Sequence, residues 1–159
     1  MRQAYERGML LRVAARELGV TFLVNDRCDL ALAVDADGVH LGQDDLPVSD
    51  ARRILGSRKI IGLSTHNPAQ VSAAAETEAD YIGFGPVFAT SSKENPDPVV
   101  GLEGLRAVRS LTTLPIVAIG GITAERYPDV LKAGADGAAV ISAILSAADV
   151  AKTVRSFLT

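Results

Sequence analysis

The chain has 159 residues, of which 48% are hydrophobic, 22% charged and 4% aromatic. This length suits a single domain spanning residues 1–159, and the apolar fraction excludes a disordered chain. The net charge of -3 gives no basic surface for nucleic acid, and no apolar run reaches the roughly 18 residues of a membrane span. The single Cys28 cannot form an internal disulfide, which is typical of a reducing compartment, so we expect a cytoplasmic protein.

The first predicted helix covers Met1–Gly19. Its apolar residues recur at helical spacing, and Gly19 is well placed to end it. The stripe that we expect to face the core consists of Leu11, Ala14, Ala15 and Leu18. The arginines that lie off this stripe are interpreted as solvated charges: Arg2, Arg7, Arg12 and Arg16.

Short apolar runs then alternate with helical stretches. Strands are predicted at Val20–Val24, Gly38–Leu41, Ile60–Leu63, Tyr81–Phe84, Pro115–Ile119 and Gly137–Ile141. Helices are predicted at Val48–Leu55, Pro68–Glu78, Leu102–Ser110, Ala124–Ala133 and Ala148–Phe157. Strands that are apolar throughout are typical of parallel sheets covered on both faces. The alternation therefore predicts an α/β fold, either a (β/α) barrel or an open doubly wound sheet. The phrases that precede two of the strands, ADY and AGADG, are interpreted as helix stops.

Polar residues follow the predicted strands, and parallel strands bring such turns to one edge of the sheet. Asp26 and Asp45 come from neighbouring strand ends, so their carboxylates could converge on Mg²⁺. Asp44 is an alternative ligand, and it could equally cap the following turn or helix.

Two features of the second half of the chain indicate a phosphate site. Gly120-Gly121 leads from a strand toward a helix, where the backbone can approach an anion closely. The neighbouring strand ends at Ile141-Ser142, and many barrels build a phosphate site from their last two loops. The irregular segment 85–101 supplies Thr90, Ser92 and Lys93, which could bind phosphate oxygens or lie in a solvated connection.

Neither histidine has a partner of catalytic type in the sequence. His40 is interpreted as a packed strand residue rather than a catalytic base. His66 lies at the edge that carries the polar turns, but no Ser or Cys nucleophile is evident beside it.

Six motifs resemble the thiamine phosphate synthase family, in the same order and spacing. They are FLVNDRCDLA, ADGVHLGQDDLP, IIGLSTHN, ADYIGFGPVFATSSK, PIVAIGGI and GADGAAVISAI. The resemblance implies a (β/α)8 TIM barrel and a transferase of thiamine biosynthesis. Such an enzyme joins hydroxymethylpyrimidine diphosphate to a thiazole phosphate and releases pyrophosphate.

The resemblance also implies roles for individual residues. Asp26 and Asp45 would hold Mg²⁺ against the diphosphate, while Asn25 and Ser64 would contact the pyrimidine. Lys93 would bind the diphosphate and, with Ser64, serve the chemical step. The residues implied for the thiazole phosphate are Thr90, Ser92, Gly121, Ile141 and Ser142. Ser92 stands where relatives often have Thr, a change that retains the hydroxyl.

The chain departs from the family pattern in length. A (β/α)8 barrel takes roughly 250 residues, and counterparts of the family's first two strands and first helix, including its Gln-x-Arg-x-Lys motif, are not found here. We therefore expect six parallel strands, an N-terminally truncated barrel and low activity of the 159-residue chain on its own. Apolar strands left at the two edges favour pairing with another copy of the chain.

Two alternatives remain beside the synthase. A related thiazole tautomerase has a histidine where this chain has Pro86, so Pro86 and the Asp26/Asp45 pair favour the synthase. A fragment that binds phosphate and oligomerises without catalysis is the other alternative.

Overall fold

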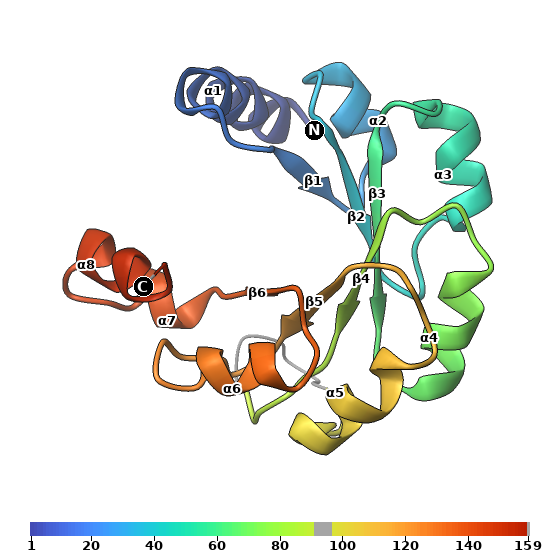
Figure 1. Ribbon diagram of the computed structural model, residues 1–159. Helices are drawn as coiled ribbons and strands as arrows, with labels where there is room; N and C mark the ends of the chain where they lie inside the picture. The colour runs from blue at the N-terminus through green and yellow to red at the C-terminus, as the bar shows by residue number, and fades with distance from the viewer. Residues whose placement is uncertain (91–96, 159) are drawn as a thin grey trace. The chain divides into compact units, whose positions relative to one another are not determined.

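The structure is a computed structural model that describes residues 1–90 and 97–158. In this part of the chain, six parallel strands alternate with helices, and the strands follow one another across the sheet in chain order (Figure 1). The predicted α/β fold with six parallel strands is confirmed. The chain divides into two compact units, Met1–Ser64 with Thr77–Asp80, and Thr65–Glu76 with Tyr81–Thr159.

In the first unit, helices and strands alternate from the N-terminus. Its elements are α1 (Arg2–Leu18), β1 (Leu23–Asn25), α2 (Cys28–Ala33), β2 (Gly38–Leu41), α3 (Val48–Leu55) and β3 (Ile60–Thr65), whose last residue belongs to the second unit. The parallel register places Val24 beside Val39 and Val39 beside Ile61. These three side chains are buried and form the centre of the unit's core.

The second unit continues the same alternation. Its elements are α4 (Pro68–Ala75), β4 (Tyr81–Phe84), α5 (Gly101–Arg109), β5 (Ile116–Ile119), α6 (Tyr127–Lys132), β6 (Gly137–Ala139), α7 (Ser142–Leu145) and α8 (Val150–Ser156). Ile82 pairs with Ile116 and Phe84 with Ala118, and all four are buried. No helix in the described ranges is long and apolar enough to cross a membrane.

Helix α1 buries a different face from the one expected. Of the predicted stripe only Ala15 is buried, whereas Leu11 is 57% and Leu18 74% exposed. The buried face instead contains Gly8 and Ala15. A side chain at Gly8 would place its Cβ only 2.9 Å from a methyl group of Val34. Small residues at 8 and 15 therefore let the helix pack closely, and this requirement overrides the apolar stripe.

Two of the four arginines interpreted as solvated charges form ion pairs with aspartates that precede β2. Arg12 is only 13% exposed and donates to Asp37 at 2.9 Å. Arg16 forms an ion pair with Asp35. The expectation was wrong for Arg12, because its carboxylate partner lies in a distant part of the sequence, ahead of β2. Arg16 is exposed, as expected.

A three-part contact, which we call the Arg–Asp clamp, recurs at the amino ends of the strands. The carboxylate of the residue preceding β2, β4 or β6 accepts a backbone N–H from the start of the previous strand. The same carboxylate also accepts an N–H of an arginine, which lies in the helix that precedes the previous strand. The three clamps are Asp37 with Phe22 and Arg12, Asp80 with Ile61 and Arg52, and Asp136 with Ile116 and Arg109.

The geometry of the clamp is nearly constant. The backbone N–H donates to the carboxylate at 2.8, 2.7 and 2.7 Å, and the arginine at 2.9, 2.8 and 3.0 Å, in chain order. In each clamp the N–H of the aspartate also donates to the carbonyl of the strand residue, at 2.8 Å. Asp80 and Asp136, which were interpreted only as part of helix stops, and Asp37 each therefore hold the start of the preceding strand.

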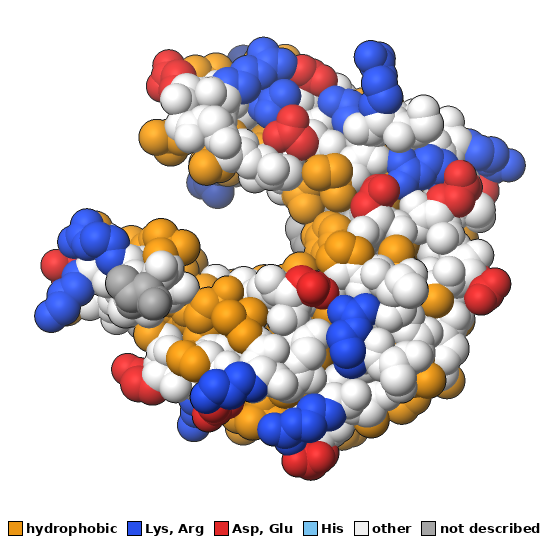
Figure 2. Space-filling model, in the orientation of Figure 1, with side chains coloured by type: hydrophobic (Ala, Val, Ile, Leu, Met, Phe, Trp, Pro, Cys, Tyr) orange, Lys and Arg blue, Asp and Glu red, His pale blue; other side chains and the backbone are white. Residues whose placement is uncertain are grey.

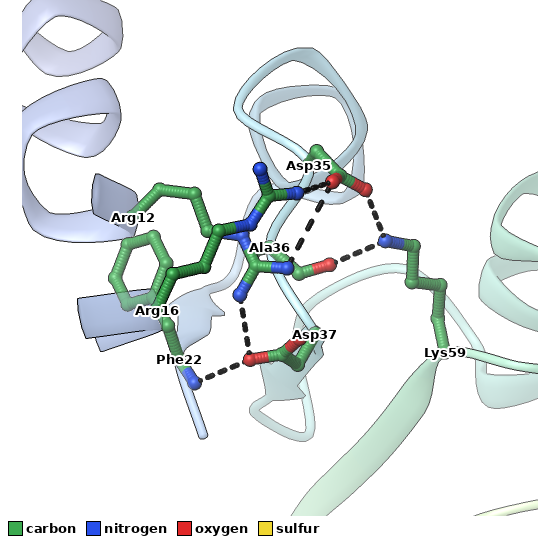
Figure 3. A network of polar contacts seen from close by, with 7 residues as sticks. All are labelled: Arg12, Arg16, Phe22, Asp35, Ala36, Asp37 and Lys59. Carbon is green, nitrogen blue, oxygen red and sulfur yellow. Dashed lines mark hydrogen bonds and ion pairs between the residues drawn. The ribbon is translucent and has the colours of Figure 1, made fainter. Parts of the chain in front are cut away.

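Figure 3 shows the first clamp and the ion pairs beside it. Asp37 lies between the backbone N–H of Phe22 and the guanidinium of Arg12. The neighbouring Asp35 accepts from Lys59 at 2.8 Å, and this contact holds the pKa of the Asp35 carboxyl below its usual value. Charges from α1 and from the residue before β3 thus converge on the segment that leads into β2.

Several element boundaries differ from the prediction. The first strand begins at Leu23 rather than Val20, and the last ends at Ala139, followed by the unexpected α7. Helix α6 begins at Tyr127 rather than Ala124, because a turn intervenes in which the N–H groups of Arg126 and Tyr127 donate to the carbonyl of Thr123. The Gly120-Gly121 loop therefore does not lead directly into a helix N-terminus.

Loss of a clamp aspartate is expected to lower the stability of the fold. Asp136→Ala leaves the N–H of the buried Ile116 without its carboxylate acceptor, so we expect the free energy of unfolding to fall by about 2 kcal/mol. Asp129→Ala is the control: it removes an exposed ion pair with Lys132 and should cost less than about 1 kcal/mol. Urea unfolding followed by circular dichroism measures both, and equal losses would contradict the clamp's role.

Candidate functional site

The structure brings the first set of predicted site residues together in the first unit. Asn25 ends β1 and donates to a carboxylate oxygen of Asp26 at 2.6 Å. The carboxyl groups of Asp26 and Asp45 are neighbours within hydrogen-bonding distance. Asp45 is held by the backbone N–H of Gly42, which donates to its carboxylate at 2.6 Å. Two strand-end loops therefore place two carboxylates side by side.

The electrostatics of this pair are unfavourable without a cation. Partial burial, and after it the contact with Asp45, raises the pKa of Asp26 above its usual value. Asp26 also has a positive φ of 63°, a conformation that Asp and Asn tolerate better than most residues. Among the described residues, no group of three or more His, Cys, Asp and Glu is placed to hold a metal ion. This pair alone could offer Mg²⁺ two carboxylates, which is a common number for that ion.

Ser64 lies near the end of β3 and contacts His40 of the neighbouring strand β2. The Nε2 atom of His40 is 2.9 Å from the Ser64 hydroxyl, and Gln43 donates to the Ser64 carbonyl at 2.7 Å. Burial lowers the pKa of His40, so its imidazole is neutral at pH 7. His40 is a half-buried strand residue, as expected, but its bond to Ser64 was missed. The register pairs His40 with Gly62, and Ser64 lies two residues further on the same face.

A cavity of about 240 Å³ lies in the second unit. Four of the residues implied for the thiazole phosphate line it: Thr90, Gly121, Ile141 and Ser142. Most of the remaining wall is apolar, with Pro86, Ile119 and Ile122 among its residues. The other two residues predicted for this region, Ser92 and Lys93, lie outside the described residues.

Close backbone packing shapes one wall of this cavity. Gly120 and Gly121 have φ angles of 89° and 62°, and a Cβ on Gly121 would lie 2.4 Å from the carbonyl oxygen of Ala89. The N–H groups of Val87 and Phe88 donate to the carbonyls of Ile119 and Gly120 at 2.8 and 3.1 Å. The loop after β5 and the segment that leads to Thr90 are thereby fixed against each other.

Three charged or titratable residues beside this cavity received no role from the sequence. Arg126 donates to the Gly121 carbonyl at 3.0 Å and stacks on the ring of Phe88, with its guanidinium carbon 4.6 Å from the ring centroid. His66 and Asp97 line the cavity and form an ion-pair contact of 3.6 Å. His66 was noted at the strand ends, but its partner comes from a later segment that the sequence does not connect to it.

Comparison with known proteins identifies the family. A family model described as thiamine monophosphate synthase matches residues 1–144. The chain is 51% identical over 154 residues to the thiamine-phosphate synthase of Chloroflexus aurantiacus. The aligned region covers 97% of this chain and 71% of that protein. The chain belongs to the thiamine monophosphate synthase family. The resemblance carried by the six motifs is confirmed, and the family is one of transferases.

Solved structures agree with this family. The thiamine phosphate pyrophosphorylase from Pyrococcus furiosus superposes with a TM-score of 0.90 and 44% sequence identity, covering 99% of this chain and 75% of that chain. An orotidine 5'-phosphate decarboxylase from Pyrococcus horikoshii superposes with a TM-score of 0.70 at 16% identity, covering 94% and 78% of the two chains. At that identity the second likeness shows the fold alone.

Because Gly121 is closely packed, a side chain at this position is expected to lower the stability of the fold. Gly121→Ala adds a Cβ that meets the backbone of Ala89, so we expect a loss of stability of about 3 kcal/mol. Gly19→Ala is the matched control, since Gly19 also has a positive φ, of 65°, but no atom within 4 Å of its Cβ position. It should cost only about 1 kcal/mol of backbone strain. Thermal unfolding compares the two, and similar losses would show that close packing at Gly121 is unimportant.

Proposed function

We propose that the chain acts as a transferase that joins hydroxymethylpyrimidine diphosphate to a thiazole phosphate, giving thiamine phosphate and pyrophosphate. Membership of the family supports this activity. The single structural observation that supports it best is the cavity of the second unit, where Thr90, Gly121, Ile141 and Ser142 gather from three separate segments. These are the residues that the family resemblance implies for the thiazole phosphate.

The cavity suits a small heterocycle that carries a phosphate. Its apolar wall would bury the thiazole ring, while the hydroxyls of Thr90 and Ser142 and the backbone at Gly121 would bind phosphate oxygens. Gly121 has no side chain, which lets a ligand approach its backbone closely. Ser92 would add a further hydroxyl to this set.

The Asp26–Asp45 pair fits a divalent cation. Each carboxylate raises the cost of ionising the other, and a bound Mg²⁺ would remove that repulsion. Two carboxylates leave the remaining positions of the ion for water and diphosphate oxygens. When bound, Mg²⁺ would neutralise charge on the leaving pyrophosphate.

The chain's own residues would bind and orient the two substrates. Asn25 and Ser64 would contact the pyrimidine, with Ser64 held by His40. The bond between the pyrimidine methylene carbon and the diphosphate oxygen breaks, and its electron pair leaves with pyrophosphate. The thiazole nitrogen then donates its lone pair to that carbon, so no protein nucleophile is required. Lys93 would stabilise the departing charge.

The thiazole tautomerase alternative is less well supported. Pro86 lines the cavity at the position where tautomerases of this superfamily have a histidine. Pro86 has no group that can transfer a proton. The transferase therefore remains the better proposal.

The partners follow from this chemistry. The chain would bind two phosphorylated small molecules, and its single Cys28 is consistent with a cytoplasmic location. We also propose self-association through the sheet edges, because β1 and β6 stand at the two ends of the strand order in the described part of the chain. Leu18 and Leu145, near these edges, are each 74% exposed, and hydrophobic side chains gather over α7 and α8 (Figure 2).

Product formation tests the proposed reaction. The purified chain is incubated with both substrates and Mg²⁺, long enough to detect a slow enzyme, and thiamine phosphate and pyrophosphate are quantified. We expect equal amounts of the two products, and none after chelation of the metal. If thiamine phosphate never forms at high substrate concentrations, the proposed function is wrong.

Two Asp→Asn substitutions, one at the metal site and one as a control, are compared in the same assay. Asp26→Asn keeps a residue that tolerates positive φ but removes the charge, so we expect kcat/KM to fall roughly a hundredfold. Asp29→Asn changes an exposed carboxylate that pairs with Arg27 and should leave the rate within about twofold. An Asp26→Asn variant with normal rate and metal dependence would rule out the metal role.

Sedimentation velocity tests self-association. We expect the chain to sediment as a dimer or larger species, and Leu145→Glu, which places a charge on the exposed helix α7 that follows β6, to shift it toward monomer. Ile54→Glu on α3 is the control, because Ile54 is also exposed, at 49%, but its helix connects β2 and β3, neither of which is an edge strand. A wild-type chain that stays monomeric at all concentrations would contradict the proposal.

A further inference from the structure

His40 lies between the two residues of the first unit that the family resemblance implies for the pyrimidine. In the parallel register, Asn25 of β1 pairs with His40 of β2, and His40 pairs with Gly62 of β3. Ser64 lies two residues beyond Gly62 and therefore on the same face of the sheet, because side chains alternate along a strand. Asn25 and Ser64 thus flank His40 on one face, and Gly62 has no side chain that would stand between His40 and Ser64.

The imidazole of His40 holds the hydroxyl group of Ser64. Its Nε2 atom lies 2.9 Å from the Ser64 Oγ atom. A serine hydroxyl has one proton and two lone pairs, and an imidazole nitrogen can donate to it or accept from it. Either tautomer of His40 therefore restricts the rotation of the hydroxyl. Val39 and Leu41, on either side of His40, are buried and anchor the strand that carries the imidazole.

The main chain at Ser64 is held by other contacts. The side chain of Gln43 donates to the Ser64 carbonyl at 2.7 Å. The preceding residue, Leu63, pairs with Leu41 in the register of β2 and β3. Loss of the imidazole should therefore leave the backbone of Ser64 in place and release only its hydroxyl.

The carboxylate pair lies near His40 but is held separately. Burial lowers the pKa of His40, and the nearby carboxylate of Asp45 acts in the opposite direction. Asp45 itself accepts the backbone N–H of Gly42 at 2.6 Å, a contact in which the imidazole takes no part. We therefore expect the pair to keep its capacity for a metal ion and pyrophosphate when the imidazole is removed.

We propose that His40 is a positioning residue of the pyrimidine site, which holds the Ser64 hydroxyl in the orientation that contacts the ring of hydroxymethylpyrimidine diphosphate. The inference rests on the proposed function, because it takes the ligand of Ser64 to be the pyrimidine. It assigns His40 no direct part in bond breaking. Its consequence is selective: loss of the imidazole weakens binding of the pyrimidine diphosphate and spares pyrophosphate, which has no ring.

Titration calorimetry in the presence of Mg²⁺ measures binding of two probes, hydroxymethylpyrimidine diphosphate and pyrophosphate. His40→Leu keeps much of the side-chain volume but removes the partner of the hydroxyl. We expect it to raise the Kd of the pyrimidine diphosphate roughly fivefold, about 1 kcal/mol, and that of pyrophosphate less than about twofold. His40→Gln is the matched control, because its amide can still bond the hydroxyl, and both Kd values should stay within about twofold of wild type.

A double variant shows whether His40 acts through Ser64. If it does, adding His40→Leu to Ser64→Ala should weaken binding of the pyrimidine diphosphate by less than about twofold beyond Ser64→Ala alone. Losses that simply add would overturn the inference, as would equal weakening for the two probes or equal losses in His40→Leu and His40→Gln. Thermal unfolding of each variant establishes that it is folded.

The remaining outcomes separate this inference from the proposed function. An unchanged Kd in His40→Leu, with thiamine phosphate still formed by wild type, would overturn the inference and leave the proposed function standing. A wild-type chain that forms no thiamine phosphate and binds the pyrimidine diphosphate no more tightly than pyrophosphate would overturn both.

Discussion

The Arg–Asp clamp is the contact on which the rest of the structure depends. A parallel strand has backbone N–H groups at its start that its neighbours do not fully satisfy, and an unsatisfied buried N–H is costly. The carboxylates of Asp37, Asp80 and Asp136 bind such groups, and an arginine from a helix balances each charge. Each clamp joins a helix, a strand and the start of the next strand. Register and helix position are thereby set together, at residues that are distant in sequence.

Within each unit, the contacts that stabilise the fold and the candidate site residues lie at opposite ends of the strands. The clamps occupy the amino ends of the strands, so the carboxyl ends are left for residues that are unfavourable for folding. Asp26 lies there with a positive φ and a neighbouring carboxylate, and Gly120 and Gly121 lie there with positive φ and close backbone contacts. Strain and like-charge repulsion cost stability. The strands that carry these residues are tied at their other ends, which allows the strained geometry to persist.

Local patterns in the sequence predict the strands well and the helix faces less well. Gly38–Leu41 and Tyr81–Phe84 are predicted to the residue because they are short, apolar on both faces and preceded by aspartate. The buried face of α1 depends instead on the close approach of Gly8 to Val34, which periodicity within the helix does not encode. Arg12 is misjudged for the same reason, since its burial depends on Asp37. In the candidate site, strand ends predict the grouping of Asp26 with Asp45 and of Gly121 with Ser142. The His66–Asp97 contact is missed because the two segments meet only in the folded chain.

The two groups of candidate site residues differ in what lies beside their carboxylates. In the first unit, Asp26 and Asp45 are neighbours, and burial, together with their contact, raises the pKa of Asp26. In the second, the carboxylate of Asp97 already has the imidazole of His66 beside it. A diphosphate brings several negative charges and can share a metal ion with carboxylates, whereas a phosphate monoester in a mainly apolar cavity has fewer ways to be neutralised. The carboxylate pair is suited to a ligand that arrives with a divalent metal.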